Sequence, residues 1–197
     1  APEDVVALSI ATRPDCLPED IVALLRRCSA RKPVWVELGL QTIHPATAQL
    51  IRRGYPTEVF DKAVSALCSI GIEVIAHVIL YLPGETEQMM LETLQYLNRS
   101  GIRGIKLQLL HVLKDTDLYG LYKAKPFFIP DMEDYIRFTG RCISILRPDI
   151  VIHRLTGDGP KDLLAAPMWT GAKRTVLNRL HRYLKEADLW QGKEYYG

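Results

Sequence analysis

The sequence predicts an α/β fold built on a parallel sheet. Strand-like and helix-like segments alternate through the first half of the chain. The strand-like runs are short and mostly continuously apolar, which is typical of strands buried on both faces. Polar clusters follow several of these runs, at the end of the strand where open sheets and barrels of this class bind ligands. With 197 residues, of which 48% are hydrophobic, the chain suits one domain with a full core.

Turn and capping signals bound each element of the first half. Pro18 and the acids after it favour a helix start, and Gly71 favours a helix end. The predicted order is a strand over 5–10, a helix opening at 18–20, a strand over 34–40, a short helix over 44–53, a helix entered at 57–60 and a strand over 72–82.

The second half continues this alternation and then loosens. Thr86 is a predicted N-cap, and Gly101 lies near the end of the helix that follows it. Beyond this helix the predicted elements are a strand over 105–112, short helical and loop segments to residue 130, a helix over 131–146, a strand over 150–152 and a basic amphipathic helix over 173–185. We expect residues 1–125 to form the main domain and residues 126–197 to form an extension packed on the same core.

Four polar clusters are expected at one rim, because parallel strands place their carboxyl ends together. Each cluster alone could be turn chemistry or a helix cap, and Arg53 could simply offset a helix dipole. The clusters are Thr12 with Arg13 and Asp15; Glu37 with Gln41; His77 with Pro83, Gly84 and Glu85; and Lys106 with His111 and Lys114.

Glu37 and Lys106 interrupt strands that are otherwise apolar. An unpaired buried charge is costly, so the two side chains either form an ion pair or face a polar cavity. His77 lies on a third apolar strand and is either a hydrogen-bonded core histidine or a ligand-binding residue.

Composition gives few signals of function. A net charge of +2 does not by itself argue for nucleic-acid binding, and no apolar run reaches the length of a membrane span. The four cysteines are spread along the chain without metal-ligand spacing. Cys28 and Cys68 lie in helical apolar patterns, so we expect these two to be buried thiols, in a reducing, cytoplasmic setting.

Residues 37–42, with Arg53 twelve positions after Gln41, resemble the fourth-strand segment of radical S-adenosylmethionine (SAM) enzymes, especially elongator protein 3 and oxygen-independent coproporphyrinogen oxidase. Further matching segments follow in family order, and the tail is similar to a bacterial subfamily of these proteins. The segments are residues 12–15, residues 81–85, residues 106–114, and the tail segments 154–158 and 166–169.

The resemblance implies a partial TIM-like (β/α)6 barrel, of which this chain supplies strands three to six and a helical extension. On this alignment, Gln41 and Arg53 would hold the methionine or ribose end of SAM, and the turn at Pro83 and Gly84, with Leu109, would contact adenine. The other candidate cofactor-binding residues are Thr12, Arg13, Glu37 and His77. The resemblance assigns no catalytic residue.

The sequence also departs from the family pattern. Ala11 and His77 stand where some relatives have an acid, which makes His77 a candidate specificity residue. The CxxxCxxC motif that binds the [4Fe–4S] cluster is absent, and scattered cysteines do not replace it. The parent reaction would be reductive cleavage of SAM to a 5′-deoxyadenosyl radical that abstracts hydrogen. We therefore expect this chain alone to bind no cluster and to be inactive.

The expected partners follow from the resemblance and from the surface. A missing N-terminal barrel portion would leave an open strand edge, which favours edge-to-edge dimers. The basic closing helix and the relatives favour an RNA substrate, such as tRNA, and a small metabolite or porphyrin-like substrate is the alternative. A non-enzymatic α/β module that binds a ligand or RNA is a third hypothesis.

Overall fold

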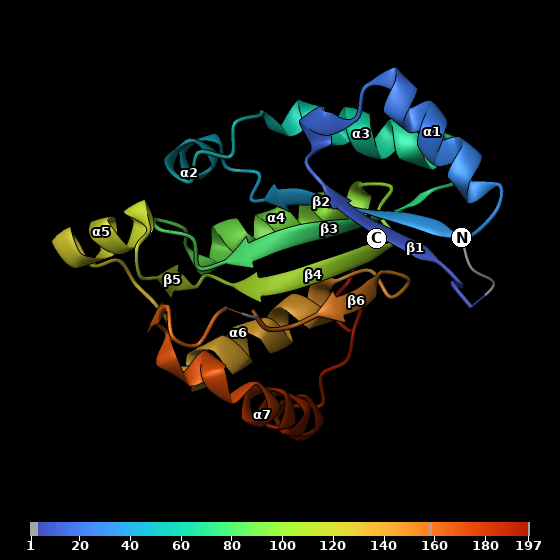
Figure 1. The fold of residues 1–197 in the computed structure, drawn as a ribbon. Helices are drawn as coiled ribbons and strands as arrows, with labels where there is room; N and C mark the ends of the chain where they lie inside the picture. Colours follow the sequence, from blue (N-terminus) through green and yellow to red (C-terminus); the bar gives the residue numbers. More distant parts are fainter. Residues whose placement is uncertain (1–3, 158, 197) are drawn as a thin grey trace.

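A five-stranded parallel sheet forms the centre of the molecule, in the order β1, β2, β3, β4, β6 (Figure 1). The structure is a computed structural model that describes residues 4–157 and 159–196, so Asp158 of the tail motif lies outside the described residues. The strands are β1 (Leu8–Thr12), β2 (Val34–Gln41), β3 (Glu73–Leu80), β4 (Gly104–Leu109) and β6 (Val151–Arg154). All neighbouring pairs are parallel, so the carboxyl ends of these strands share one edge. The predicted α/β fold is confirmed.

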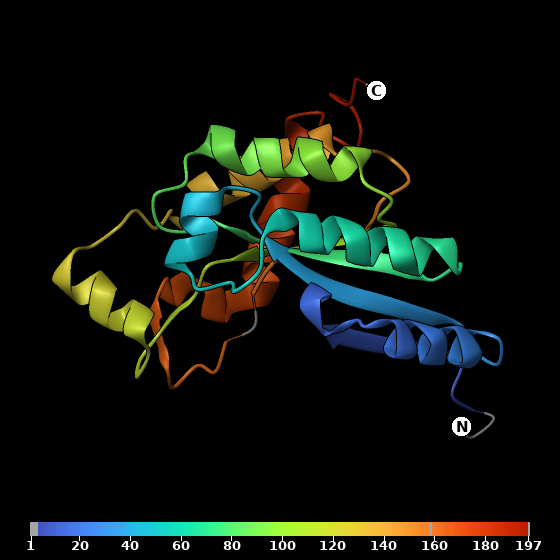
Figure 2. The ribbon, with the colours of Figure 1, turned by 90° about the horizontal axis from the view of Figure 1, so that it is seen from above.

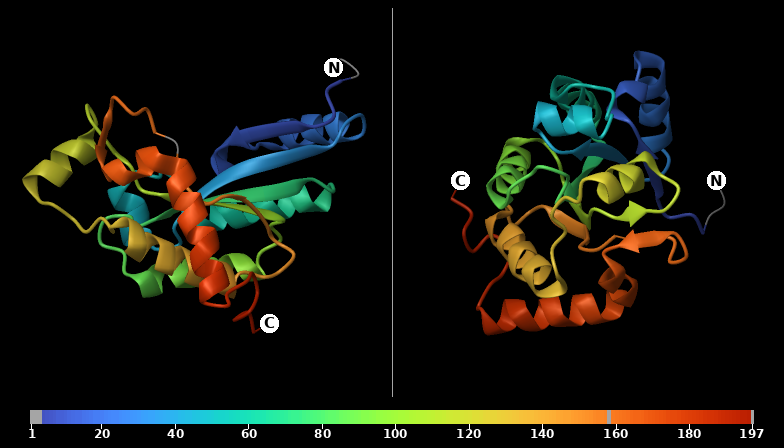
Figure 3. Two further views of the ribbon diagram at one scale, coloured as in Figure 1. Left: turned by 90° about the horizontal axis from the view of Figure 1, so that it is seen from below. Right: turned by 90° about the vertical axis from the view of Figure 1, so that its left-hand side faces the viewer.

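Helices connect the strands. They are α1 (Glu19–Ser29), α2 (Pro45–Leu50), α3 (Thr57–Ser69), α4 (Glu87–Arg99), α5 (Asp117–Ala124), α6 (Met132–Ile145) and α7 (Lys173–Glu186), with short 3-10 turns η1 (Pro14–Cys16) and η2 (Met168–Ala172). Helices α1, α3, α4 and α6 cover one face of the sheet, whereas α7 packs on α6 and α5 projects from the sheet (Figures 2 and 3). Among the described residues, none of these helices is both long and apolar enough to cross a membrane.

The main core lies between the sheet and these helices. Val36, Leu38 and Leu40 alternate along β2 and are fully buried, and they belong to the same cluster as Phe60 of α3 and Leu94 of α4. Burying each such side chain stabilises the folded state by roughly 1.5–3 kcal/mol. The intervening residues of β2 are only half-buried, because the other face of the sheet is less covered. That open face carries the polar residues of the strands.

Two predicted elements end three residues earlier than expected. The strand predicted to reach Val112 ends at Leu109, and the chain then leaves the sheet so that β5 (Val112–Leu113) pairs antiparallel with β7 (Leu164–Ala166). The helix predicted to reach Arg53 ends at Leu50, because Arg52 and Gly54 both adopt positive φ angles, of 54° and 87°. Such angles break a right-handed helix.

Capping residues set the other boundaries. The hydroxyl of Thr86 accepts a hydrogen bond from the Met89 amide at 3.3 Å, which confirms the predicted N-cap of α4. Asp131 caps α6 through the Asp134 amide at 2.8 Å. Thr57, at the predicted helix entry, is the first residue of α3 and its N-cap is Pro56.

Candidate functional site

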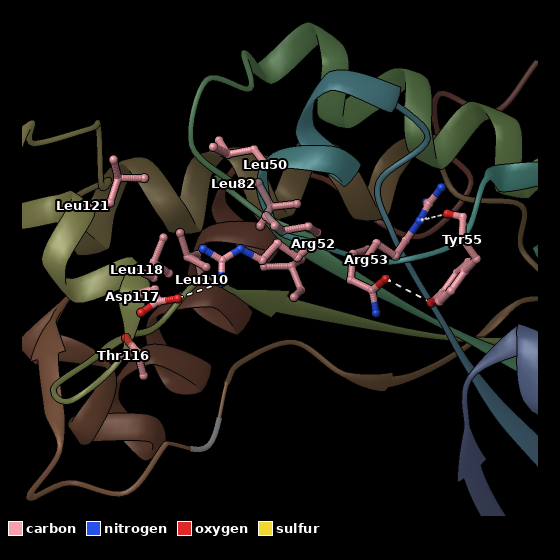
Figure 4. Close-up of a pocket in the computed structure, with 13 residues that line it drawn as sticks. Leu50, Arg52, Arg53, Tyr55, Leu82, Leu110, Thr116, Asp117, Leu118 and Leu121 are labelled. Carbon is pink, nitrogen blue, oxygen red and sulfur yellow. Dashed lines mark hydrogen bonds and ion pairs between the residues drawn. The ribbon is translucent and has the colours of Figure 1, made fainter.

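A cleft of about 710 Å³ opens at the carboxyl edge of the sheet, between α2 and α5 (Figure 4). Its walls are largely apolar, and an ion pair of 2.7 Å between Arg52 and Asp117 spans its mouth. Gln41 and Arg53 both reach this cleft. The apolar lining residues include Leu50, Ile79, Leu82, Leu110, Leu118 and Leu121.

Gln41 is held in an unusual conformation at the end of β2. Its φ is 60°, at a point where the pairing of β2 with β3 shifts register. Its amide folds back over Gly39, where a Cβ would lie 2.3 Å from Gln41 Nε2. The Tyr55 hydroxyl donates to the Gly39 carbonyl at 2.7 Å and lies 3.5 Å from Gln41 Oε1. The glycine and the tyrosine therefore position the Gln41 amide.

Arg53 is buried and fixes the turn after β2. Its Nε donates to the Tyr55 carbonyl at 2.9 Å, and its Nη1 donates to the carbonyls of Leu40 and Thr42 at 2.9 and 2.6 Å. Nη2 donates to the hydroxyl of Thr57 at 3.2 Å. Burial lowers the pKa of the guanidinium, against the opposing effects of Tyr55 and Glu58. One of its five N–H groups is left for a ligand, so in this conformation Arg53 does not offer a carboxylate two parallel hydrogen bonds.

Arg13 approaches the same region through Tyr55. It forms two hydrogen bonds with the Asp15 carboxylate, at 2.9 and 2.6 Å, and its guanidinium lies 5.3 Å from the Tyr55 ring centroid. Arg53 lies 5.1 Å from the same centroid. Thr12 alternates with Ala11 along β1, so its side chain points to the helix-covered face, away from the open one.

Pro83 and Gly84 form the turn between β3 and α4. Tyr81 and Gly84 have positive φ angles of 62° and 86°, and the Glu85 amide donates to the Leu82 carbonyl at 3.0 Å. The Glu85 carboxylate accepts a hydrogen bond from the Thr42 hydroxyl, and burial raises its pKa. The turns after β2 and β3 are thereby linked.

Leu109 belongs to the core rather than to the cleft. It is buried with the helix-facing residues, whereas its neighbour Leu110 lines the cleft. Successive residues of a strand face opposite sides, so a shift of one position separates the two roles. The sequence reading also missed Ile79 and Leu118, because an apolar cleft wall and a core position have the same composition.

A second polar group lies on the open face of the sheet. Its members include Glu37, four residues before Gln41 on β2, and His77, two residues before Ile79 on β3. Glu37 accepts from the Ser9 hydroxyl at 2.9 Å, from His77 Nε2 at 2.7 Å and from Lys106. Gln108 Nε2 lies 3.4 Å from His77 Nδ1. The predicted Glu37–Lys106 ion pair is present, and His77 joins it.

The surroundings set the protonation of this group. Burial disfavours the Glu37 carboxylate, but hydrogen bonds from Lys106, His77 and Ser9 outweigh it and lower the pKa to about 2. Burial lowers the pKa of His77, against the raising effect of Glu37. Near neutral pH, Glu37 is charged and His77 is neutral, donating through Nε2. Lys106 and Gln108 keep N–H groups with which to orient a polar ligand on this face.

Within the described residues, no three Cys, His, Asp or Glu side chains gather as a bound metal ion would require. The four cysteines are free thiols, and Cys142 is the buried one. The expected burial was wrong for Cys68, which is exposed, and Cys28 is only half-buried. These side chains do not form a site that fits an iron–sulfur cluster.

Two family models match the chain. The Radical SAM superfamily matches residues 2–97, and the Radical_SAM C-terminal domain matches residues 102–186. YtqA of Bacillus subtilis is 40% identical over 97% of this chain and 59% of its own length. A tRNA uridine(34) acetyltransferase of Methanocaldococcus infernus is 28% identical over 93% of this chain and 34% of its own length. The chain thus spans about three fifths of YtqA.

Solved structures show the same fold. Elp3 of Methanocaldococcus infernus superposes with a TM-score of 0.81 at 23% identity, over 94% of this chain and 43% of that one. Coproporphyrinogen III oxidase of Escherichia coli superposes with a TM-score of 0.55 at 17% identity, over 68% of this chain and 32% of that one. The two family models, which match residues 2–97 and 102–186, establish that the chain belongs to the radical SAM superfamily.

Proposed function

We propose that this chain forms the SAM-binding rim of a radical SAM enzyme. The carrying observation is the Gln41 amide, which is held over Gly39 by Tyr55 at the mouth of an apolar cleft. A cleft of about 710 Å³ is within the usual range for small ligands. Leucine walls suit a flat base, and the amide offers both a donor and an acceptor to polar groups. These residues fit SAM.

SAM and a [4Fe–4S] cluster together supply radical chemistry in this family, and the protein positions the reactants and excludes water. The described residues offer no group of ligands for the cluster. In our proposal the cluster ligands lie in a part of the full-length protein outside this segment. This chain alone would then bind SAM without turning it over.

We further propose an RNA substrate. One of the relatives is a tRNA uridine(34) acetyltransferase, whose name states that its substrate is an RNA. Helix α7 adds exposed cations that suit a phosphate backbone, namely Arg174, Arg182 and Lys185. Arg179 of the same helix is tied to Glu133 at 2.6 Å. Lysine and arginine contacts with phosphates supply the salt-dependent part of such binding.

Calorimetric titration of SAM into the chain tests the proposed rim. We expect saturable binding that Gln41→Ala weakens roughly tenfold, because an amide hydrogen bond to a polar ligand is lost. Gln88→Ala, which removes an amide from the exposed face of α4, is the matched control and should bind like the wild type. Absence of binding by the wild type, or equal binding by Gln41→Ala, would contradict the assignment.

A further inference from the structure

Helix α5 and the residues after it project from the body of the protein (Figures 1 and 2). None of the eight residues of α5 is buried. Phe128, just beyond it, is 67% exposed, although its ring lies 5.9 Å from that of Tyr81. We call residues 118–128 the aromatic arm. Its exposed apolar surface is the kind that marks a binding site.

The arm combines aromatic rings with positive charge. Lys123 Nζ lies 4.6 Å from the Tyr119 ring centroid, and the Tyr122 and Phe127 rings meet edge-on at 5.1 Å. Lys123 and Lys125 are its charged residues, and it contains no Asp or Glu. Rings interleaved with cations suit a polyanion that has flat faces, which is the chemistry of unpaired nucleotides. A purely apolar protein partner would leave these lysines without a role.

The arm also borders the cleft. Leu118 and Leu121 form its wall on the α5 side, opposite Leu50 and Arg52 (Figure 4). The ion pair between Arg52 and Asp117 anchors the base of the helix across the mouth. A nucleotide chain lying on the arm would therefore have one base at the entrance to the site that contains Gln41.

We propose that the aromatic arm binds unpaired nucleotides of an RNA by stacking and presents one of them to the cleft. This inference rests on the proposed RNA substrate and adds the location and the mode of contact. Tyr119, Tyr122 and Phe128 supply stacking surfaces, and Lys123 and Lys125 contact phosphates.

Fluorescence anisotropy of a short, labelled, unstructured RNA with the purified chain tests the proposal. Phe128→Ala should weaken binding roughly tenfold, within the range for one stacked base. Tyr122→Phe keeps a ring and should bind like the wild type. Tyr196→Ala is the matched control, because Tyr196 is an aromatic residue near the carboxyl terminus that is 89% exposed. Its RNA affinity should also equal that of the wild type. Circular dichroism confirms that each variant is folded.

The charges give a second, independent readout. Lys123→Ala with Lys125→Ala should lower the slope of log affinity against log salt by about 1.4, since each phosphate contact on a single strand contributes about 0.7. Duplex RNA hides its base faces, so Phe128→Ala should not affect its binding.

The outcomes distinguish RNA binding by the aromatic arm from the proposed RNA substrate on which it rests. If RNA binds but only Arg182→Ala with Lys185→Ala weakens it, the arm is overturned and an RNA substrate stands. If the chain shows no salt-dependent RNA binding, both are overturned, and the SAM titration still tests the rim.

Discussion

At the scale of single residues, the rim is built from conformations that most residues avoid. Gln41, the last residue of β2, and Tyr81, directly after β3, adopt φ angles of 60° and 62°. A left-handed non-glycine residue costs roughly 1–3 kcal/mol, and such strain concentrates at functional sites. The Arg53 hydrogen bonds to the carbonyls of Leu40 and Thr42 hold the first of these turns in place. The strain therefore supports a ligand role for Gln41.

Gly39→Ala tests the link between Gly39 and Gln41. The new Cβ would meet the end of the Gln41 side chain, which can swing away. We therefore expect the free energy of unfolding, measured in urea, to change by less than about 1 kcal/mol. SAM binding should fall about as far as in Gln41→Ala, roughly tenfold, because the amide is displaced. Unchanged SAM affinity would show that the position of the amide is unimportant.

The Glu37 group predicts a pH dependence of stability. The carboxyl pKa is about 2 in the folded chain against 4.5 in the reference state, so its stabilisation is present above pH 4.5 and is lost as pH falls toward 2. A shift of this size corresponds to at most about 3 kcal/mol, because solvent partly screens this half-buried group. Glu37→Gln should therefore be less stable than the wild type near neutral pH, and the difference should shrink in acid.

Urea unfolding at a series of pH values measures this difference. Glu73→Gln, at an exposed glutamate on β3, is the matched control and should follow the wild type at every pH. His77 acts in the same direction. Burial lowers its pKa below the usual 6.5, so the folded state loses stability relative to the unfolded state as the pH falls below 6.5. A gap between Glu37→Gln and the wild type that does not vary with pH would refute the assignment.

At the scale of elements, we expect alanine substitution at two helical glycines to change the stability of the protein in opposite directions. A Cβ at Gly140 of α6 would lie 2.7 Å from the Tyr183 ring of α7, whereas nothing lies within 4 Å of one at Gly120 of α5. We expect Gly140→Ala to destabilise the fold by about 1–3 kcal/mol through overpacking. Gly120→Ala should instead stabilise α5 by up to about 1 kcal/mol. Urea unfolding and helix content by circular dichroism measure the two effects, and equal responses would contradict the packing.

The sequence predicts elements well where local signals and burial agree. The apolar run of β2 and the Thr86 cap of α4 follow from residue type and spacing alone. The pairing of β5 with β7 was missed, because strands of two and three residues have no periodicity to detect. The hydrogen bonds of Arg53 were missed as well. Its partners are mostly backbone carbonyls, and only the folded chain brings them together.

At the scale of the whole molecule, the sheet has an open edge. Within the described part of the chain, β1 pairs with β2 on one side only, and both Leu8 of β1 and Val6 just before it are exposed. Such an edge is a template for another strand. We propose that it pairs with a missing barrel portion in the full-length protein and with a second copy when this chain is alone.

Light scattering during size exclusion tests this edge. We expect the mass to rise toward that of a dimer with increasing concentration. Val6→Lys with Leu8→Lys should restore a monomer, because edge lysines oppose strand pairing. A wild type that stays monomeric at all concentrations would rule out pairing between copies.

The most direct test of the proposed SAM rim is a titration of SAM into the isotope-labelled chain, followed by NMR. We predict saturable shifts of the backbone amides of Gln41, Leu82 and Leu110, which line one cleft at the carboxyl edge of the sheet. The backbone amide signals of residues in the separate cleft between α6 and α7, such as Arg141 and Tyr183, should not shift. Shifts confined to that second cleft, or no shifts at all, would contradict the account.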